Sequence, residues 1–177
     1  MPAGHFGIDE CRRVFQWIRS QPDSANLAKQ LTASVAEIDF MGYKLKKMQP
    51  THSENLRMLI LLVKYWFKTE VKAKQVVDFK SYVLELVCLD TWEKKLQSPT
   101  VNLPACFQAV LRELVDFGRI RYLWADKYER ADVLSPLFAQ SPLIVDPEDP
   151  WRNIANEVDW LPVREAAAKA LDSLSRL

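Results

Sequence analysis

Two carboxylates separated by one residue, Asp146 and Glu148, are the first candidates for chemistry in this 177-residue sequence. At the end of a strand, this spacing places both side chains on one face, where they could hold magnesium for nucleotidyl transfer. However, no Gly-Ser turn and helix precede them to hold a triphosphate, and Pro147 and Pro150 predict a rigid turn. We therefore expect a solvated loop that packs the C-terminal helix, and no catalytic residue.

Lys64 and Tyr82 are candidates for binding rather than for bond making. Lys64 is surrounded by apolar neighbours in LILLVKYWFK. Because burying an unpaired ammonium is costly, this lysine must either snorkel to solvent or meet an anion. Tyr82, near the start of the next predicted helix, carries a ring that could stack on a nucleobase. The alternative is a snorkelling lysine and a core tyrosine without any ligand.

The residue types required by several other chemistries are scarce. Only two histidines are present, which is too few for a zinc or haem site and leaves no positioned partner for a nucleophilic triad. The three cysteines are far apart in apolar surroundings, which indicates buried thiols in a reducing compartment. With four glycines, neither the P-loop nor the Rossmann pattern is present. We expect no metal site.

The bulk composition predicts a single domain over residues 1–177, because 49% hydrophobic and 11% aromatic residues suffice for one core. Twenty-four basic and 23 acidic residues leave a net charge of +1, which gives no overall attraction to nucleic acid or membrane. The first 80 residues carry 13 basic and 8 acidic side chains, so they predict either a basic face or an ordinary mixed surface. The sequence lacks a signal core and a membrane-length apolar run, which favours the cytoplasm.

Apolar residues spaced by three and four predict about five helices. The first two are expected over 9–20 and 25–48, with a bend near Gly42 in the second. The third should begin at a capping box, Thr51 to Glu54, and continue to about Glu70. Because this helix is apolar nearly all round, we expect it in the centre of the bundle.

The second half of the sequence adds two more helices, a small edge element and a terminal helix. Asp78 should cap a helix through FKSYVLELVCLDTWEKKL, and Pro104 should begin another that ends at Gly118. Alternating residues over 119–124 and the branched run over 142–145 predict a two-strand edge element. With a terminal helix over 161–174, the expected fold is a mostly α helical bundle.

The segments LILLVKYWFK, SYVLELVCLDTWEK, FQAVLRELVDFGRIRYLW and PLIVDPEDPWRN resemble, in order and spacing, the C-terminal helical half of the 2′,5′-oligoadenylate synthetases. The resemblance covers about residues 35–170 and leaves 1–33 as an N-terminal helical extension. Members of that family are innate immune nucleotidyltransferases that polymerise ATP, with magnesium, on sensing double-stranded RNA. Their catalytic carboxylates lie in a preceding lobe, so the resemblance implies a half-enzyme that is inactive alone and holds no cofactor in this chain.

The resemblance also implies roles for particular residues. The lysine of the LVKxW motif, which contacts ATP phosphates, falls on Lys64, and the adenine-stacking tyrosine falls on Tyr82. The family's arginine three residues before the lysine is Leu61 here, and the glutamine before the tyrosine is Ser81. A phosphate clamp that lacks one arm should bind weakly.

Partners follow from the same resemblance. The basic residue that the family turns toward RNA aligns with Lys46, with Lys47 adjacent, so double-stranded RNA is an expected partner, and ATP is expected where the catalytic lobe is present. No membrane partner is expected. A lobe interface left exposed would favour self-association. The alternative to the half-enzyme is a non-catalytic binding or scaffold module, with double-stranded RNA as its candidate ligand.

Overall fold

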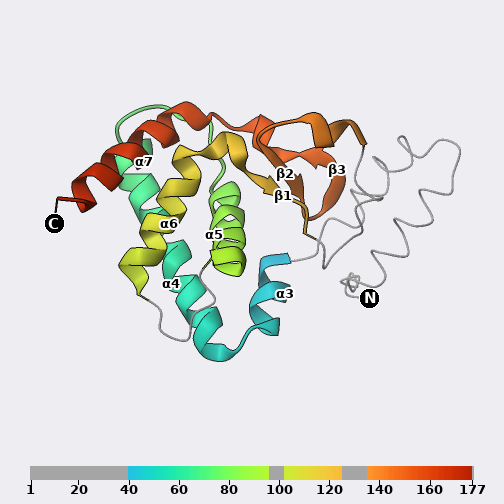
Figure 1. Ribbon diagram of the computed structural model, residues 1–177, viewed down its shortest axis with the longest axis horizontal. Helices are drawn as coiled ribbons and strands as arrows, with labels where there is room; N and C mark the ends of the chain where they lie inside the picture. Colours follow the sequence, from blue (N-terminus) through green and yellow to red (C-terminus); the bar gives the residue numbers. More distant parts are fainter. Residues whose placement is uncertain (1–39, 96–101, 125–134, 177) are drawn as a thin grey trace, which may run out of the picture. The chain divides into compact units, whose positions relative to one another are not determined.

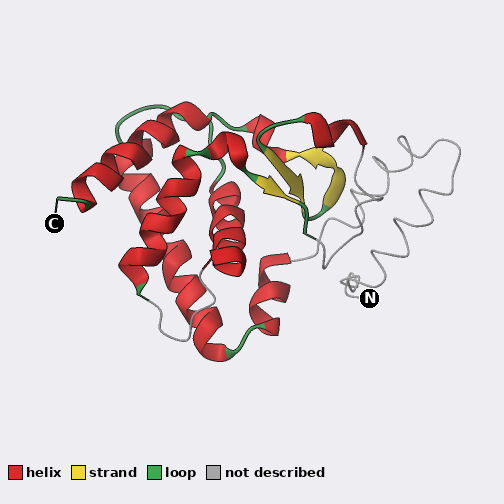
Figure 2. Ribbon diagram, in the orientation of Figure 1, coloured by secondary structure: helices red, strands yellow, loops and turns green. Residues whose placement is uncertain are grey.

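The computed structural model describes residues 40–95, 102–124 and 135–176 (Figure 1). The chain divides into two compact units, Met1–Tyr43 with Arg121–Ala155, and Lys44–Ile120 with Asn156–Leu177. The described residues form helices and one small sheet, which confirms the predicted mostly α class (Figure 2). The helix predicted over 9–20 and the first part of that predicted over 25–48 lie outside the described residues.

Two consecutive helices, α3 (Phe40–Lys47) and α4 (Pro50–Trp66), open the described part of the chain. Pro50 stands in the first turn of α4, where its missing N–H costs no helical hydrogen bond. The predicted capping box at Thr51 is wrong, because the helix begins after Gln49 and no side chain caps it. The expected extension toward Glu70 is present as a π-helical turn, η1 (Phe67–Lys72).

Helix α5 (Ser81–Lys95) is buried around nearly its whole circumference from Val83 to Trp92. The sequence predicted α4 for the centre of the bundle, and this prediction is wrong. Although α4 buries one side through Leu59, Val63 and their neighbours, it leaves large apolar side chains exposed on the other: Met58, Leu61 and Tyr65. The apolar composition of α4 could not reveal which of its faces would be covered.

Helix α6 (Leu103–Val115) packs against α4, α5 and α7 within the helical unit (Figure 1). The Asn102 side chain caps its start by accepting a hydrogen bond from the Ala105 N–H. The helix ends at Asp116 and a 3-10 turn follows, η2 (Phe117–Arg119). Gly118 lies in that turn with an ordinary negative φ, so the predicted glycine end is wrong in its mechanism.

Helix α7 (Trp160–Leu174) completes the unit and begins at Asp159, whose side chain accepts from the Leu161 N–H. Its first residue is anchored by aromatic contacts, since the Trp160 ring stacks on Phe117 and meets Phe79 edge to face. The Asp159 N–H also donates to the Asp78 carbonyl, 2.8 Å away. These contacts fix the start of α7 against the segment that precedes α5.

The sheet belongs to the other unit and has the order β1-β2-β3. β1 (Arg121–Tyr122) pairs in parallel with β2 (Leu143–Asp146), which confirms the two predicted strands; the sequence did not predict their relative direction. β2 then pairs antiparallel with β3 (Asp149–Asn153), a strand that the sequence analysis missed because two prolines predicted only a turn there. Short 3-10 turns, η4 (Ser135–Ala139) and η5 (Ile154–Glu157), flank the sheet.

None of the helices in the described ranges combines the length and the apolar character that a membrane span requires.

Candidate functional site

Lys64 lies near the end of α4 and reaches α5, the helix that packs beside it. Its Nζ lies 2.5 Å from the Glu85 Oε1 atom, with 38% of the lysine side chain and 22% of the glutamate side chain exposed. Of the two alternatives posed by the sequence, meeting an anion is therefore the one realised. The anion is a side chain of the same chain, and it lies at the edge of the bundle rather than in the core.

Tyr82 lies one helical turn before Glu85 on α5 and is half-buried. Residues three apart on an α-helix are neighbours on one face, so Tyr82 shares its face with the partner of Lys64. The structure thus brings the two predicted nucleotide-binding residues to one edge of the α4–α5 pair. We call Lys64, Tyr82 and Glu85 the α4–α5 edge. The Glu85 carboxylate that pairs with Lys64 was not anticipated from the sequence.

The pKa of Cys88, one turn beyond Glu85, is affected by the charges of Glu85 and Lys64. Burial raises the pKa of the Cys88 thiol well above its ordinary value, the Glu85 carboxylate raises it further, and the Lys64 ammonium opposes both. Since a protonated thiol is a poor nucleophile, Cys88 acts as a buried apolar residue, as the sequence predicted for the cysteines.

Leu61 occupies the position at which the resemblance places a second phosphate-binding side chain. It lies one turn before Lys64 on the same face of α4, and 63% of it is exposed. Met58 and Tyr65, also exposed, continue this face in both directions along the helix. We call Met58, Leu61 and Tyr65 the α4 stripe. The stripe is apolar at the position beside Lys64 where a phosphate site with two cations would have its second cation.

The basic end of α3 separates into two kinds of lysine. Lys44 is buried and forms an ion pair with Glu93 of α5, so its charge is compensated inside the bundle. Lys46 and Lys47 are exposed on the last turn of the helix. Exposed ammonium groups can neutralise phosphates of a nucleic acid, which Lys44 cannot do from its position. Lys46 and Lys47 belong to α3 and take no part in the Lys64–Glu85 pair.

The pair Asp146 and Glu148 is not the solvated loop that the sequence predicted, because Asp146 is the buried last residue of β2. Its two carboxylate oxygens are both engaged, one by the Glu148 N–H at 2.9 Å and the other by the Arg152 guanidinium at 3.4 Å. Across the described ranges, no three His, Cys, Asp or Glu side chains gather as a metal site would require. The magnesium that the family implies therefore does not fit the described residues.

One titratable group was not singled out by the sequence analysis. Asp90 is buried on α5, and its burial raises the pKa of the carboxyl from an ordinary 3.8 to about 6, against the opposing effect of Lys94. Lys94, one turn later, lies 2.9 Å from it. An aspartate inside the apolar run LVCLDTW was the available signal, because a buried carboxylate is rare without a partner.

The chain is similar to known proteins of one family. A family model described as 2'-5'-oligoadenylate synthetase 1, domain 2, C-terminus matches residues 25–176. Bovine 2'-5'-oligoadenylate synthase 2 is 31% identical over 137 residues, 73% of this chain and 19% of that protein. Mouse 2'-5'-oligoadenylate synthase 3 is 30% identical over 125 residues, 65% of this chain and 11% of that protein.

A third relative carries a different description. Mouse inactive 2'-5'-oligoadenylate synthase 1D is 33% identical over 103 residues, 55% of this chain and 28% of that protein. The chain thus spans less than a third of the length of each of these three relatives.

The helical unit defines the class of protein as a mostly helical domain, in which Lys64 of α4 pairs with Glu85 of α5. Since the family model covers most of the chain, the chain belongs to the 2'-5'-oligoadenylate synthetase family. This confirms the resemblance inferred from the LVKxW motif and the segments that follow it.

Proposed function

We propose that this chain is the C-terminal helical half of an oligoadenylate-synthetase-like nucleotidyltransferase and contributes the α4–α5 edge to an ATP site. The observation that carries the proposal is the placement of Lys64 and Tyr82 on adjoining helices, with Lys64 paired to Glu85, one helical turn beyond Tyr82. A lysine is a point charge suited to phosphate, and a half-buried tyrosine ring suits a nucleobase. A separate catalytic lobe would supply the metal-binding carboxylates, which the described residues do not supply.

The geometry also limits how strongly this half-site can bind. Glu85 holds the Lys64 ammonium, so an incoming phosphate must compete with a carboxylate at 2.5 Å. Leu61 offers no second cation. Because a bidentate or two-cation clamp supplies most of the strength of a phosphate site, ATP should bind this chain weakly.

The direct test is calorimetric titration of the 177-residue chain with ATP. Lys64→Ala should weaken binding about tenfold, the typical loss for a charge-assisted contact. Lys68→Ala is the matched control, since Lys68 is exposed on η1 beyond the α4–α5 edge. Tyr82→Ala should also weaken binding, whereas Tyr82→Phe should retain the stacking. An unchanged dissociation constant for Lys64→Ala would count against the proposal.

A second candidate function is a non-catalytic binding module, and the exposed Leu61 beside a neutralised Lys64 favours it. This candidate expects no measurable ATP affinity in the chain and no gain when a catalytic lobe is supplied in trans. The mouse relative that is described as inactive provides a precedent for loss of synthesis within the family.

Both candidates allow an RNA surface at the end of α3. We propose that Lys46 and Lys47 contact phosphates of double-stranded RNA, in the cytoplasm and in innate immune sensing. Replacing both by alanine should reduce the slope of log affinity against log salt by about one for each lost contact. The control is Lys94→Ala with Lys95→Ala, two lysines that also lie on the last turn of a helix and that pair with Asp90 and Glu113. Equal slopes for the two double variants would remove RNA binding at α3.

A further inference from the structure

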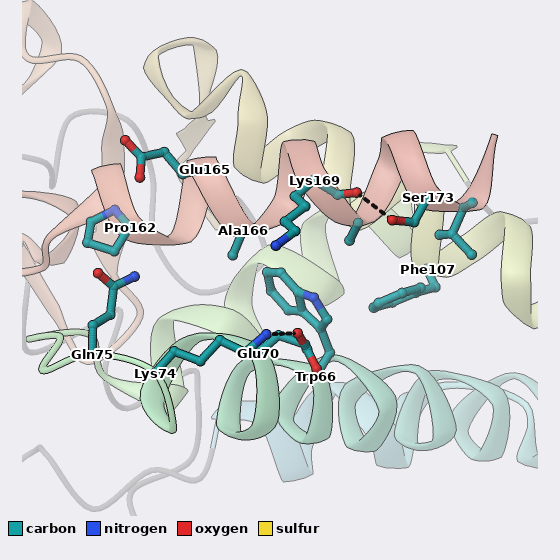
Figure 3. A pocket seen from close by; sticks show the side chains of 12 residues that line it. Trp66, Glu70, Lys74, Gln75, Phe107, Pro162, Glu165, Ala166, Lys169 and Ser173 are labelled. Atoms are coloured by element: carbon teal, nitrogen blue, oxygen red, sulfur yellow. Dashed lines mark hydrogen bonds and ion pairs between the residues drawn. The ribbon is translucent and has the colours of Figure 1, made fainter. Parts of the chain in front are cut away.

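A pocket of about 440 Å³ lies in the helical unit between α4 with η1, α6 and α7 (Figure 3). Its aromatic lining consists of Trp66 and Phe107, whose rings meet edge to face at 6.2 Å. Ala166 and Ala170, four residues apart on α7, line the opposite wall. These two small side chains leave space between α7 and the aromatic rings. The resulting volume lies in the range of small-molecule sites.

The Trp66 side chain supplies a buried donor without an acceptor. Only 6% of the residue is exposed, and its Nε1 has no hydrogen-bond partner within the described residues. The indole rises from α4 toward α7, into the space that the pocket occupies (Figure 3). Because that nitrogen is covered by the protein, a ligand in the pocket would meet the ring of Trp66 rather than its N–H.

The charges around the pocket favour an anion. Lys169 extends from α7 toward Trp66 (Figure 3), and within the described residues its Nζ forms no ion pair. Glu70 accepts a hydrogen bond from Lys74 at 2.5 Å, and this contact, with smaller help from Lys169, lowers the pKa of the Glu70 carboxyl. Glu70 is thus bonded by Lys74 alone, and Lys169 acts on it only through space. Glu165 extends toward the Pro162 end of the pocket, away from Lys169 (Figure 3).

We propose that this pocket binds a small planar aromatic anion. Its ring system would lie against Trp66, Phe107 and the alanines of α7. Its acidic group would pair with Lys169. This site is separate from the α4–α5 edge, because Trp66 and Lys64 are two residues apart and therefore point to nearly opposite sides of α4.

The test uses the whole chain and two dyes with the same aromatic body. 1-Anilinonaphthalene-8-sulfonate carries one sulfonate, and N-phenyl-1-naphthylamine carries none. We expect one-to-one binding of the sulfonate, with a dissociation constant on the order of 10–100 μM for a ligand of this size. The neutral dye should bind about three- to tenfold more weakly, the difference that one charge-assisted contact makes. Equal affinity for both dyes, or no saturable binding of the sulfonate, would overturn the proposal.

Variants then assign the contacts. Lys169→Met should lower the affinity for the sulfonate to that for the neutral dye, whereas the matched control Lys68→Met, outside the pocket, should change neither. Glu70→Gln should raise the affinity for the sulfonate about two- to fivefold, because it removes a competing anion, and leave the neutral dye unaffected. Sulfonate binding that responds equally to the two lysine variants would contradict the site.

Two further variants test the interior of the pocket. Trp66→Phe, which replaces the indole with a smaller aromatic ring, should weaken binding of both dyes about two- to threefold, because ring surface against the ligand is lost. Ala166→Leu with Ala170→Leu should fill the pocket and abolish binding of both dyes. Circular dichroism checks that each variant is folded. If these core variants unfold, the two-dye comparison on the unmodified chain and on Lys169→Met still decides the question, and binding that survives a folded, filled pocket overturns it.

Discussion

Helix α4 carries two faces that differ in how their charges are satisfied. On one face, Lys64 is held by Glu85 of α5, so the cation is already neutralised within the chain. On the other, Trp66 and Glu70 face α7, from which Lys169 extends without an ion pair among the described residues. Lys64, which the LVKxW motif singled out, is thus already paired with a carboxylate of the chain. Lys169, which no motif singled out, is the lysine that we propose binds a ligand.

The largest difference in stability between two sites of α4 is expected for two of its leucines. Leu59 is fully buried and Leu61 is mostly exposed on the α4 stripe. Leu59→Ala should lower the free energy of unfolding by about 2–5 kcal/mol, because it leaves a cavity in the core. Leu61→Ala should change it by less than about 0.5 kcal/mol. Urea unfolding of both variants measures the difference, and similar losses would mean that the stripe is covered in solution.

A smaller effect is expected from the buried charge on α5. Because the pKa of Asp90 is raised to about 6 in the folded chain, the folded state holds this proton more tightly than the unfolded state. The resulting stabilisation is complete below about pH 4 and is lost as the pH rises through 6. Asp90→Asn should remove this part of the pH dependence and stabilise the chain at pH 7.5 by about 1 kcal/mol.

The measurement for Asp90 is urea unfolding of the two proteins at pH 4.5 and at pH 7.5. The control is Asp172→Asn, an exposed aspartate one turn from Arg176 on α7, which should leave the difference between the two pH values unchanged. Parallel pH profiles for the unmodified chain and Asp90→Asn would show that Asp90 is ionised in the fold at all these values.

Lys64 and Lys169 should also differ in how much each contributes to the stability of the fold. Lys64→Ala leaves Glu85 partly buried without its partner, so we expect a loss of about 0.5–1 kcal/mol for this half-exposed pair. Lys169→Ala should stay within about 0.5 kcal/mol of the unmodified chain, since it breaks no ion pair. Thermal unfolding at low and high salt compares them, and only the Lys64 effect should shrink as salt screens the pair.

The smallest effect on stability, and a gain in binding, is expected from restoring a cation beside Lys64. Leu61→Arg adds a guanidinium at an exposed position, so the fold should be unchanged, while the affinity for ATP should rise about three- to tenfold. Met58→Arg places the same charge one turn farther away and is the matched control. Equal gains in the two variants would reveal a general charge effect instead of a clamp at the α4–α5 edge.

We predict that the chain self-associates, and we expect the contact to be made by the α4 stripe. Three exposed apolar side chains at spacings of three and four residues form the kind of patch that favours association. Sedimentation at several concentrations should show association in the unmodified chain and less in Leu61→Arg. A concentration-independent monomer in both proteins would assign the stripe no role in self-association.

Much of this protein could be predicted from local sequence. Apolar spacing fixed the existence of helices over α4, α5, α6 and α7 within a few residues, because each must bury one face, and the alternation before Trp124 predicted β1. The LVKxW motif placed Lys64 on one helix, and the segment SYVLELVCLDTWEK placed Tyr82 on the next. Each of these signals arises from residues within a single helix or strand, so it can be recognised without knowing how the elements pack.

Other features depended on which surfaces meet. The burial of α5 instead of α4, the capture of Lys64 by Glu85 and the pocket over Trp66 all arise from side chains that are distant in sequence and adjacent only in the packed bundle. The third strand, β3, also needed β2 beside it to overcome the turn preference of its prolines. Local patterns were thus sufficient for the family and for most elements, but not for β3. The tertiary structure decided which lysine is neutralised and which is left for a ligand, because ion pairing requires a partner within a few ångströms, and sequence spacing does not specify that partner.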